Sequence, residues 1–336
     1  MDIKETIEKV VDGKSLSQAE SQEAAEAIMD GKATDAQIAA LLVSLRLKGE
    51  TRDEITGFVR AMRAKATRVP CSNEDIVDTC GTGGDRSGTF NVSTLSALVA
   101  AGAGCPVAKH GNRSVSSRCG SADLFSELGV QVNLDPGRIS RCIDEAGIGF
   151  LFAPNLHQAM KNAMGPRREI GVRTIFNILG PLTNPAGAKR QVLGVFDGAL
   201  TDVLAHVLNG LGSRHVLVVH GEDGLDEITL TGETRVSELK NGSVTRYRIR
   251  PEEFGFRRAT LKDLRGGDAR TNARIAMHVL SGEMGTARDM VLLNAGAVIY
   301  AGGKAGTVQE GIHKAAESID SGRALQKLQL LRQLTA

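Results

Sequence analysis

Four glycines and several small hydroxyl and amide side chains lie together in residues 78–94, DTCGTGGDRSGTFNVST. An apolar pair precedes them, and an apolar run from Leu95 to Ala103 follows. Glycine lets backbone N–H groups approach an anion closely, and the first N–H groups of a helix lack partners within it. Asn91, Ser93 and Thr94 fall where that helix should begin, so the segment predicts a phosphate-binding loop. Taken alone, an ordinary structural turn explains these residues equally well, since neither of the two common phosphate-loop patterns is present.

A second segment, Lys109–Arg118, reads KHGNRSVSSR and follows a short apolar stretch. It combines three cations with one glycine, one amide and three hydroxyl groups, and a helix is expected from Ser121 to Leu128. This composition predicts a second anion site in which side-chain charge adds to backbone donors. A solvated basic loop is the alternative. Two such sites one helix apart fit a ligand with two separated phosphate groups.

A third segment supplies negative charge. Four carboxylates, among them Asp226 and Glu227, crowd the glycine-containing loop 220–228 after the strand-like run 216–219. Mg²⁺ usually takes one or two carboxylates and completes its shell with water and substrate phosphate. The loop therefore predicts a magnesium site, with an acidic surface turn as the alternative.

A fourth segment, residues 165–185, reads GPRREIGVRTIFNILGPLTNP. Arg167 in this segment has the planar guanidinium that can bind a carboxylate through two parallel hydrogen bonds. We place it in the first turn of a helix, where a solvated surface cation is the alternative interpretation.

Composition sets the class of protein. The 336 residues contain 41 Lys and Arg against 39 Asp and Glu, a formal charge of +2, which gives no argument for a nucleic-acid or membrane partner. We expect no signal sequence and no membrane-spanning segment, because the N-terminus is charged and amphipathic and the apolar runs are short. The cysteines are odd in number and form no C-x-x-C pair, so we expect reduced thiols in a cytoplasmic enzyme; they are Cys71, Cys80, Cys105, Cys119 and Cys142.

The elements that must position these segments follow from local patterns. Three capping boxes occur in the first seventy residues, and a glycine precedes each of them, as expected at the end of the preceding helix. From Ile76 onward, apolar strand-like runs alternate with helical patterns, which indicates a largely parallel sheet with helices on both faces. Asn241-Gly242 predicts a hairpin, and the C-terminal quarter is expected to be helical.

The predicted fold class is therefore α/β. We expect a small N-terminal helical domain over residues 1–70 and a larger α/β domain over residues 71–336, with a mostly parallel central sheet. The segment 168–188 is expected to pack onto the helical domain.

These four segments, in this order, resemble the anthranilate phosphoribosyltransferase family. The matching motifs are GTGGD with NVST, KHGNR with SS, RxExGxRTxFNxLGPLxNP, and GxDE, and the resemblance spans nearly the whole chain. It implies a nucleoside phosphorylase/phosphoribosyltransferase-like fold. It also implies transfer of the phosphoribosyl group of 5-phosphoribosyl 1-pyrophosphate to the amine of anthranilate, in tryptophan biosynthesis, with Mg²⁺ as cofactor and a homodimer as the assembly.

The same resemblance assigns roles to individual residues. His110 is a candidate proton acceptor, with a positioning role equally favoured. Anthranilate would be bound by Gly81, Asn112 and Arg167, and the metal by Ser93, Asp226 and Glu227. The donor would be bound by Gly81, Gly84, Asp85, Thr89, Asn91, Val92, Ser93, Thr94, Lys109, His110, Gly111, Asn112, Arg113, Ser114, Val115, Ser116, Ser117 and Ser121.

Three other functions remain open at this point. A pyrimidine nucleoside phosphorylase should carry a KHSTGG-type phosphate loop, whereas Lys109-His110 is followed here by Gly111-Asn112. A non-enzymatic nucleic-acid-binding relative should have a strongly basic surface and lack the acidic pair. A nicotinamide-dependent oxidoreductase should carry the dinucleotide-binding fingerprint.

Overall fold

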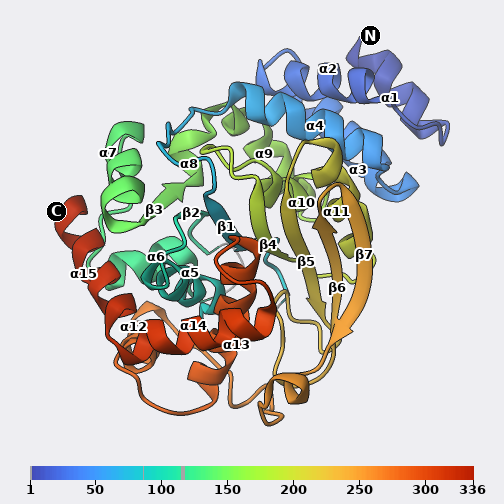
Figure 1. Ribbon diagram of the computed structural model, residues 1–336. Helices are drawn as coiled ribbons and strands as arrows, with labels where there is room; N and C mark the ends of the chain where they lie inside the picture. The colour runs from blue at the N-terminus through green and yellow to red at the C-terminus, as the bar shows by residue number, and fades with distance from the viewer. Residues whose placement is uncertain (1, 86, 115–117) are drawn as a thin grey trace.

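The computed structural model describes residues 2–85, 87–114 and 118–336. Its first four helices lie together at one end of the molecule, at the top of Figure 1. They are α1 (Ile3–Val11), α2 (Gln18–Met29), α3 (Asp35–Lys48) and α4 (Arg52–Lys65).

The predicted capping boxes are confirmed at the start of α2, α3 and α4. In each, the hydroxyl of the capping residue accepts a hydrogen bond from the N–H three residues later, and the Glu or Gln side chain there bonds back to the capping N–H. Gly13, Gly31 and Gly49, which follow α1, α2 and α3, all have positive φ. Local sequence thus fixes where these four helices begin and end.

A seven-stranded sheet forms the centre of the molecule, in the order β3-β2-β1-β4-β5-β6-β7. The first five strands in this order are parallel and the last two are antiparallel, so the predicted mostly parallel sheet is confirmed. The β6–β7 connection is the predicted hairpin, with positive φ at Asn241 and Gly242. The strands are β1 (Val77–Gly81), β2 (Val107–Gly111), β3 (Ile148–Phe152), β4 (Arg190–Gly194), β5 (His215–Gly221), β6 (Thr234–Lys240) and β7 (Ser243–Ile249).

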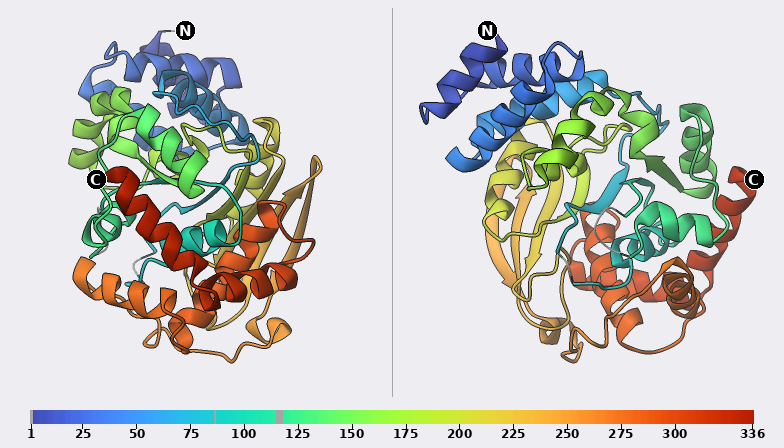
Figure 2. Two further views of the ribbon diagram at one scale, coloured as in Figure 1. Left: turned by 60° about the vertical axis from the view of Figure 1, so that its left-hand side comes forward. Right: turned by 180° about the vertical axis from the view of Figure 1, so that it is seen from behind.

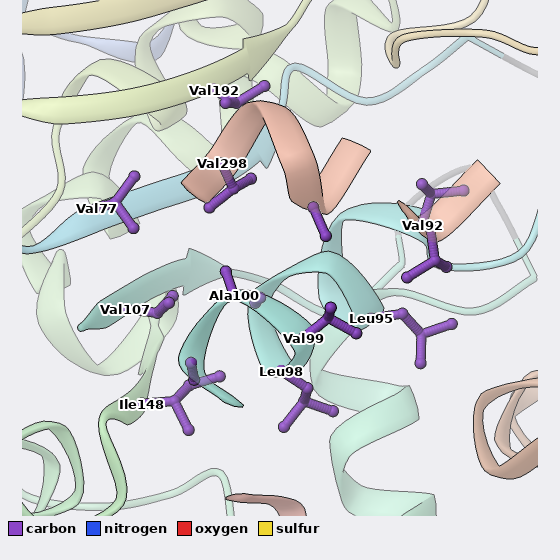
Figure 3. Packing of buried hydrophobic residues seen from close by; sticks show 14 of the residues in the cluster. Val77, Val92, Leu95, Leu98, Val99, Ala100, Val107, Ile148, Val192 and Val298 are labelled. Atoms are coloured by element: carbon purple, nitrogen blue, oxygen red, sulfur yellow. The ribbon is translucent and has the colours of Figure 1, made fainter. Parts of the chain in front are cut away.

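Helices cover both faces of this sheet. Successive side chains of β5 point to opposite faces of the sheet. Leu217 and Val219 therefore lie in one apolar core, and Val216 and Val218 lie in the other. The first core contains α5 (Val92–Gly102), and Figure 3 shows its side chains against β1 and β2. Other helices that contribute to that core include α6 (Ser121–Glu127), α12 (Ala269–Leu280), α13 (Thr286–Ala301), α14 (Val308–Asp320) and α15 (Arg323–Thr335).

The second core contains α11 (Leu200–Gly210) and the four N-terminal helices. Phe58 of α4 lies in it together with Leu193 of β4 and Val216 of β5. The helical end of the molecule therefore shares one apolar core with the sheet. The division of the chain at residue 70 stays a prediction.

Residues 153–182 form short helices beside the N-terminal ones (Figure 2). The Asn162 side-chain amide donates to the Met29 carbonyl at 2.7 Å, and Arg63 donates to the Leu182 carbonyl at 2.8 Å. These helices are α8 (Ala153–Leu156), a 3₁₀ turn (Gln158–Met160), α9 (Lys161–Ile170), α10 (Phe176–Leu179) and a second 3₁₀ turn (Gly180–Leu182).

The helix that begins at Pro136 changes type before it ends at Gly147. It begins as α7 (Pro136–Arg141) and finishes as a π-helical turn (Cys142–Ala146), before Gly147 takes positive φ. A further 3₁₀ turn covers Pro251–Phe254. No helix among the described residues is both long and apolar enough to cross a membrane.

Candidate active site

The C-terminal ends of β1, β4 and β5 lie side by side, because Gly81 pairs with Gly194 and Gly194 pairs with Val219. The glycine-rich loop after β1 and the acidic loop after β5 therefore meet at this edge. The Gly83 N–H donates to the Asp226 carboxylate at 2.9 Å, and a Cβ at Gly81 would collide with the same carboxylate oxygen. The structure thus brings the first and third sequence segments into direct contact.

The helix predicted after the glycine-rich loop starts at Val92, as expected. Asn91 precedes it, but its side chain does not cap the helix. Its amide nitrogen donates to the Cys119 carbonyl at 3.0 Å, and its amide oxygen accepts from Asn272 at 2.8 Å. Asn91 therefore connects the glycine-rich loop to the second loop. Thr94 lies in the first turn with a buried hydroxyl that has no hydrogen-bond partner among the described residues.

The outer arm of the glycine-rich loop is held by residues 264–267. Thr89 pairs with Arg265 in an isolated antiparallel bridge, and the Gly266 N–H donates to the Gly88 carbonyl at 2.9 Å. Within the loop, the Ser87 hydroxyl donates to the Asp85 carboxylate at 2.5 Å. The loop is therefore anchored to other segments at Gly83 and at residues 88–89.

The three residues predicted to hold metal, Ser93, Asp226 and Glu227, come together. Burial and the nearby charge of Asp85 raise the pKa of Asp226 to about 6. Burial and the charge of Asp226 raise the pKa of Glu227 well above its usual range. A hydrogen bond from the Ser93 backbone N–H acts in the opposite direction and lowers it. Carboxylates with raised pKa values are stabilised in their ionised form by a cation.

These residues fit Mg²⁺ rather than a metal with a complete protein cage. No group of three or more His, Cys, Asp or Glu side chains that could hold a metal occurs among the described residues. Mg²⁺ suits such a site because substrate oxygens and water complete its octahedral shell. The position of the two carboxylates beside the glycine-rich loop is compatible with that arrangement.

Lys109 differs from the exposed loop cation that the sequence pattern indicates. It lies in β2, and its buried ammonium group donates to the Thr79 carbonyl at 2.6 Å and contacts the Ser93 hydroxyl at 3.3 Å. Burial lowers the pKa of Lys109, while Asp78, Glu227 and Asp226 act in the opposite direction. Its positive charge therefore lies close to the carboxylate pair.

Asp123 organises the second loop, and sequence reasoning missed it. Its carboxylate accepts hydrogen bonds from the Ser114 N–H at 3.0 Å and the Gly120 N–H at 2.9 Å, and it pairs with Arg113 at 2.9 Å. The available signal was an acidic residue in the first turn of a helix after a cationic loop. Val115, Ser116 and Ser117, predicted to bind the donor, lie outside the described residues.

Asn112 and its neighbours close the other end of this loop. The Asn112 carbonyl accepts from the Ser121 hydroxyl and from the Ala122 N–H, both at 3.2 Å. A Cβ at Gly111 would collide with that Ser121 hydroxyl oxygen. Glycine at position 111 thus allows β2 to turn directly into the loop.

Arg167 lies in the last turn of α9, so the predicted position in a first turn is wrong. The helix starts earlier, at Lys161, and continues through Pro166. The Arg167 guanidinium lies 5.2 Å from the centre of the Phe176 ring, and burial lowers its pKa. Within the described part of the chain Arg167 forms no ion pair, whereas its neighbour Arg168 is more exposed. A guanidinium held flat by an aromatic ring keeps its N–H groups available for a carboxylate.

Two buried histidines, His110 in β2 and His157 after α8, lie next to each other near the segment 165–185. His110 places Nδ1 3.1 Å from the Gly180 carbonyl oxygen, and its ring lies 5.1 Å from that of His157. Burial lowers the pKa of His110 to about 3 and that of His157 to about 4. Both rings are therefore neutral at pH 7, and in both Nε2 is buried with no partner among the described residues. His110 fits an orienting role better than that of a general base, for which a pKa near the working pH is needed. His157 carried no sequence signal.

A buried hydrogen-bond network joins β1 and β2 to the segment 165–185. The Asn184 amide donates to the Asp78 carboxylate and to the Ala108 carbonyl, each at 2.8 Å. The other Asp78 oxygen accepts from the His110 N–H at 3.1 Å. Asp78 and Asn184 therefore fix β1, β2 and the 165–185 segment relative to one another, a role that neither residue type indicates in the sequence.

Comparisons with known proteins agree with this geometry. Residues 73–325 match the family described as "Glycosyl transferase family, a/b domain", and residues 4–66 match its "helical bundle domain". The chain is 57% identical over 329 residues to the anthranilate phosphoribosyltransferase of Moorella thermoacetica, covering 98% of this chain and 97% of that protein. The same identity holds over 333 residues with that of Pelotomaculum thermopropionicum, covering 99% and 96%.

Solved structures give the same result. The anthranilate phosphoribosyltransferase of Thermus thermophilus superposes with a TM-score of 0.94 at 45% identity, covering 98% of this chain and 99% of that one. The Saccharomyces cerevisiae enzyme in complex with PRPP and Mg superposes with a TM-score of 0.90 at 28% identity, covering 99% and 97%. By its motifs, its fold and these relatives, the chain belongs to the anthranilate phosphoribosyltransferase family.

Proposed function

We propose that this protein transfers the phosphoribosyl group of 5-phosphoribosyl 1-pyrophosphate to the amine of anthranilate, giving N-(5-phosphoribosyl)anthranilate and pyrophosphate in tryptophan biosynthesis. The observation that carries the proposal is the contact between the acidic loop and the glycine-rich loop at the start of α5. Backbone donors and carboxylates meet there, as a metal-bound pyrophosphate requires.

Mg²⁺ is the proposed cofactor, held by Asp226, Glu227 and Ser93. When bound, it would neutralise charge on the departing pyrophosphate. The buried ammonium of Lys109 supports the same region with a fixed positive charge, since it lies against Ser93. The glycine-rich loop and the second loop would bind the donor's anionic groups through the predicted residues.

Anthranilate is proposed to bind on the side of Arg167. The guanidinium would pair with the carboxylate of the substrate, and Asn112 would orient its ring and amine. The amine nitrogen forms a bond to ribose C1 while the bond from C1 to pyrophosphate oxygen breaks, and the amine then loses a proton. Neutral His110 would help to exclude water and orient the amine, so proximity supplies much of the rate.

We also propose a homodimer formed through the helical end of the molecule. Large apolar side chains are exposed there, namely Val11 on α1, Leu47 on α3 and Met164 on α9. The α3 helix contacts both α1 and α9, so the three lie on neighbouring helices. Exposed apolar side chains on neighbouring helices support an association surface at this end of the molecule. The five free thiols support the proposed cytoplasmic location.

A fluorescence assay tests the activity. Purified protein is mixed with anthranilate, 5-phosphoribosyl 1-pyrophosphate and Mg²⁺, and the loss of anthranilate emission is followed. Loss of emission that requires both the donor and the metal is expected. Phosphorolysis of pyrimidine nucleosides without any change in anthranilate would instead support the phosphorylase alternative.

A further inference from the structure

Arg173 connects two parts of the candidate site that come from different segments of the chain. It lies between α9 and α10, in the same segment as Arg167. Its guanidinium donates a hydrogen bond to the Gly84 carbonyl and lies 4.1 Å from the centre of the Phe196 ring. No carboxylate of the described residues pairs with Arg173. Its polar contact is therefore made to the backbone of the glycine-rich loop.

Phe196 gives this guanidinium a fixed platform. The residue follows β4, and its backbone N–H donates to the Thr82 hydroxyl at 3.1 Å. The Thr82 N–H in turn donates to the Gly194 carbonyl at 2.9 Å. Phe196 and Arg173 are thus both bonded to the glycine-rich loop, Phe196 through Thr82 and Arg173 through the Gly84 carbonyl. Stacking on the Phe196 ring restricts the guanidinium to one plane.

A comparison of Gly84 with Gly83 shows that only position 84 lies close to the Arg173 guanidinium. Both have positive φ, which disfavours any L side chain. A Cβ at Gly84 would lie 2.9 Å from Nη2 of Arg173, whereas a Cβ at Gly83 would meet nothing within 4 Å. A side chain at position 84 would therefore displace the Arg173 guanidinium, in addition to requiring positive φ.

The hydrogen bond to Gly84 also sets the direction of a backbone donor. In a trans peptide the carbonyl and the following N–H point in opposite directions. With the Gly84 carbonyl turned toward Arg173, the Asp85 N–H is turned away from it. The preceding Gly83 N–H is held by Asp226. Two separate segments thus fix the two ends of this short turn.

We infer that Arg173 is a positioning residue for the phosphoribosyl donor, which fixes the Gly84–Asp85 peptide and ties the donor loop to the segment carrying Arg167. The inference rests on the proposed function, because it assigns the donor to this loop. Arg173 acts here through the loop backbone and does not itself supply charge to the ligand.

The test measures donor binding by calorimetry, with 5-phosphoribosyl 1-pyrophosphate and Mg²⁺ and without anthranilate. Arg173→Ala should weaken donor binding about tenfold, the lower range for a hydrogen bond from a charged group. Arg173→Lys should not restore it, because an ammonium cannot stack as a plane and reach the carbonyl together. Arg168→Ala, at another arginine of the same segment, is the matched control and should bind the donor normally.

Two further measurements separate positioning from a direct contact. Amide exchange across residues 81–85 of the unliganded protein should be faster in Arg173→Ala than in the wild type. Phe196→Leu should weaken donor binding as well, and the double variant should lose less than the product of the two single losses.

Full rescue by Arg173→Lys would overturn the inference in favour of a direct charge contact with the ligand, and unchanged binding in Arg173→Ala would also overturn it. If wild-type protein binds the donor but leaves anthranilate unmodified, the proposed function fails while the role of Arg173 stands.

Discussion

The part of the site proposed to bind the phosphoribosyl donor (the donor side) and the part proposed to bind anthranilate (the acceptor side) are built in different ways. On the donor side, the Gly83 N–H already donates to the Asp226 carboxylate, and the buried Thr94 hydroxyl has no partner among the described residues. On the acceptor side, Arg167 has no carboxylate partner among the described residues, and Nε2 of His110 and of His157 is buried and unpaired within the same set. The loops proposed to bind the phosphoribosyl donor thus hold two buried carboxylates whose ionised form a cation would stabilise. The segment proposed to bind anthranilate instead holds a cation that has no carboxylate partner among the described residues.

This difference predicts that the two sides respond to different changes. Substitutions on the donor side should alter the metal and donor dependence of the reaction. Substitutions on the acceptor side should alter the KM for anthranilate and leave donor binding unchanged.

The largest effect is expected from Asp226→Asn combined with Glu227→Gln. Removing both carboxylates should lower kcat/KM roughly a hundredfold or more, because charge on the leaving pyrophosphate would lose its counter-ion. The measurement is the Mg²⁺ dependence of turnover, with circular dichroism to confirm folding. Near-normal turnover of the folded variant at limiting Mg²⁺ would contradict this metal assignment.

Arg167→Ala should raise the KM for anthranilate by about tenfold or more, since a charge-assisted hydrogen bond is worth about 1.5–3 kcal/mol. Donor affinity should not change, and kcat should fall less than kcat/KM because most of this binding is uniform. Steady-state kinetics with each substrate varied in turn provides the measurement. Arg168→Ala is the control, and identical behaviour of the two variants would show that Arg167 does not bind anthranilate.

A smaller effect is expected from Gly84→Ala than from loss of Arg167. The added Cβ would meet the Arg173 guanidinium, and the alanine backbone would have to keep positive φ, so donor affinity should fall roughly threefold to fivefold. Gly83→Ala has the same unfavourable φ but an open surrounding, and it should weaken donor binding less. Calorimetric titration of both variants provides the comparison, and equal losses would show that backbone conformation alone sets the effect.

The smallest effect concerns pH and stability. The pKa of Asp226 is about 6 in the folded protein against 3.8 ordinarily, so the folded state binds more protons than the unfolded state between these values. Without metal, this group should therefore lower the free energy of unfolding as pH rises from about 4 to about 6. Thermal unfolding across that range should show the trend in the wild type and a weaker trend in Asp226→Asn. An unchanged trend in the variant would assign it to other groups.

The local sequence predicted correctly those features that depend on residues close together in the chain. The capping boxes of the first helices, the Asn241-Gly242 hairpin and the start of α5 all depend on residues a few positions apart. The meeting of the glycine-rich and acidic loops was also accessible, because both follow parallel strands and such strands end at one edge of the sheet.

Sequence reasoning failed where burial or distant contacts decide the outcome. Lys109 looks like a loop cation, but strand pairing buries it and turns its ammonium toward Thr79. Arg167 was expected in the first turn of a helix, yet the helix begins at Lys161 and continues through Pro166. The contacts of Arg173 with Gly84 and of Asn184 with Asp78 join residues far apart in the chain, and no local pattern shows them.

The apolar core shared by the N-terminal helices and the sheet has a consequence for folding. Phe58 and Ile55 of α4 lie in one core with Leu193 and Val195. Separating the helices from the sheet would expose that apolar surface to water on both sides at once. The N-terminal helices and the sheet should therefore melt together in a single cooperative transition, and the acceptor side of the site would be lost at the same temperature as the donor side.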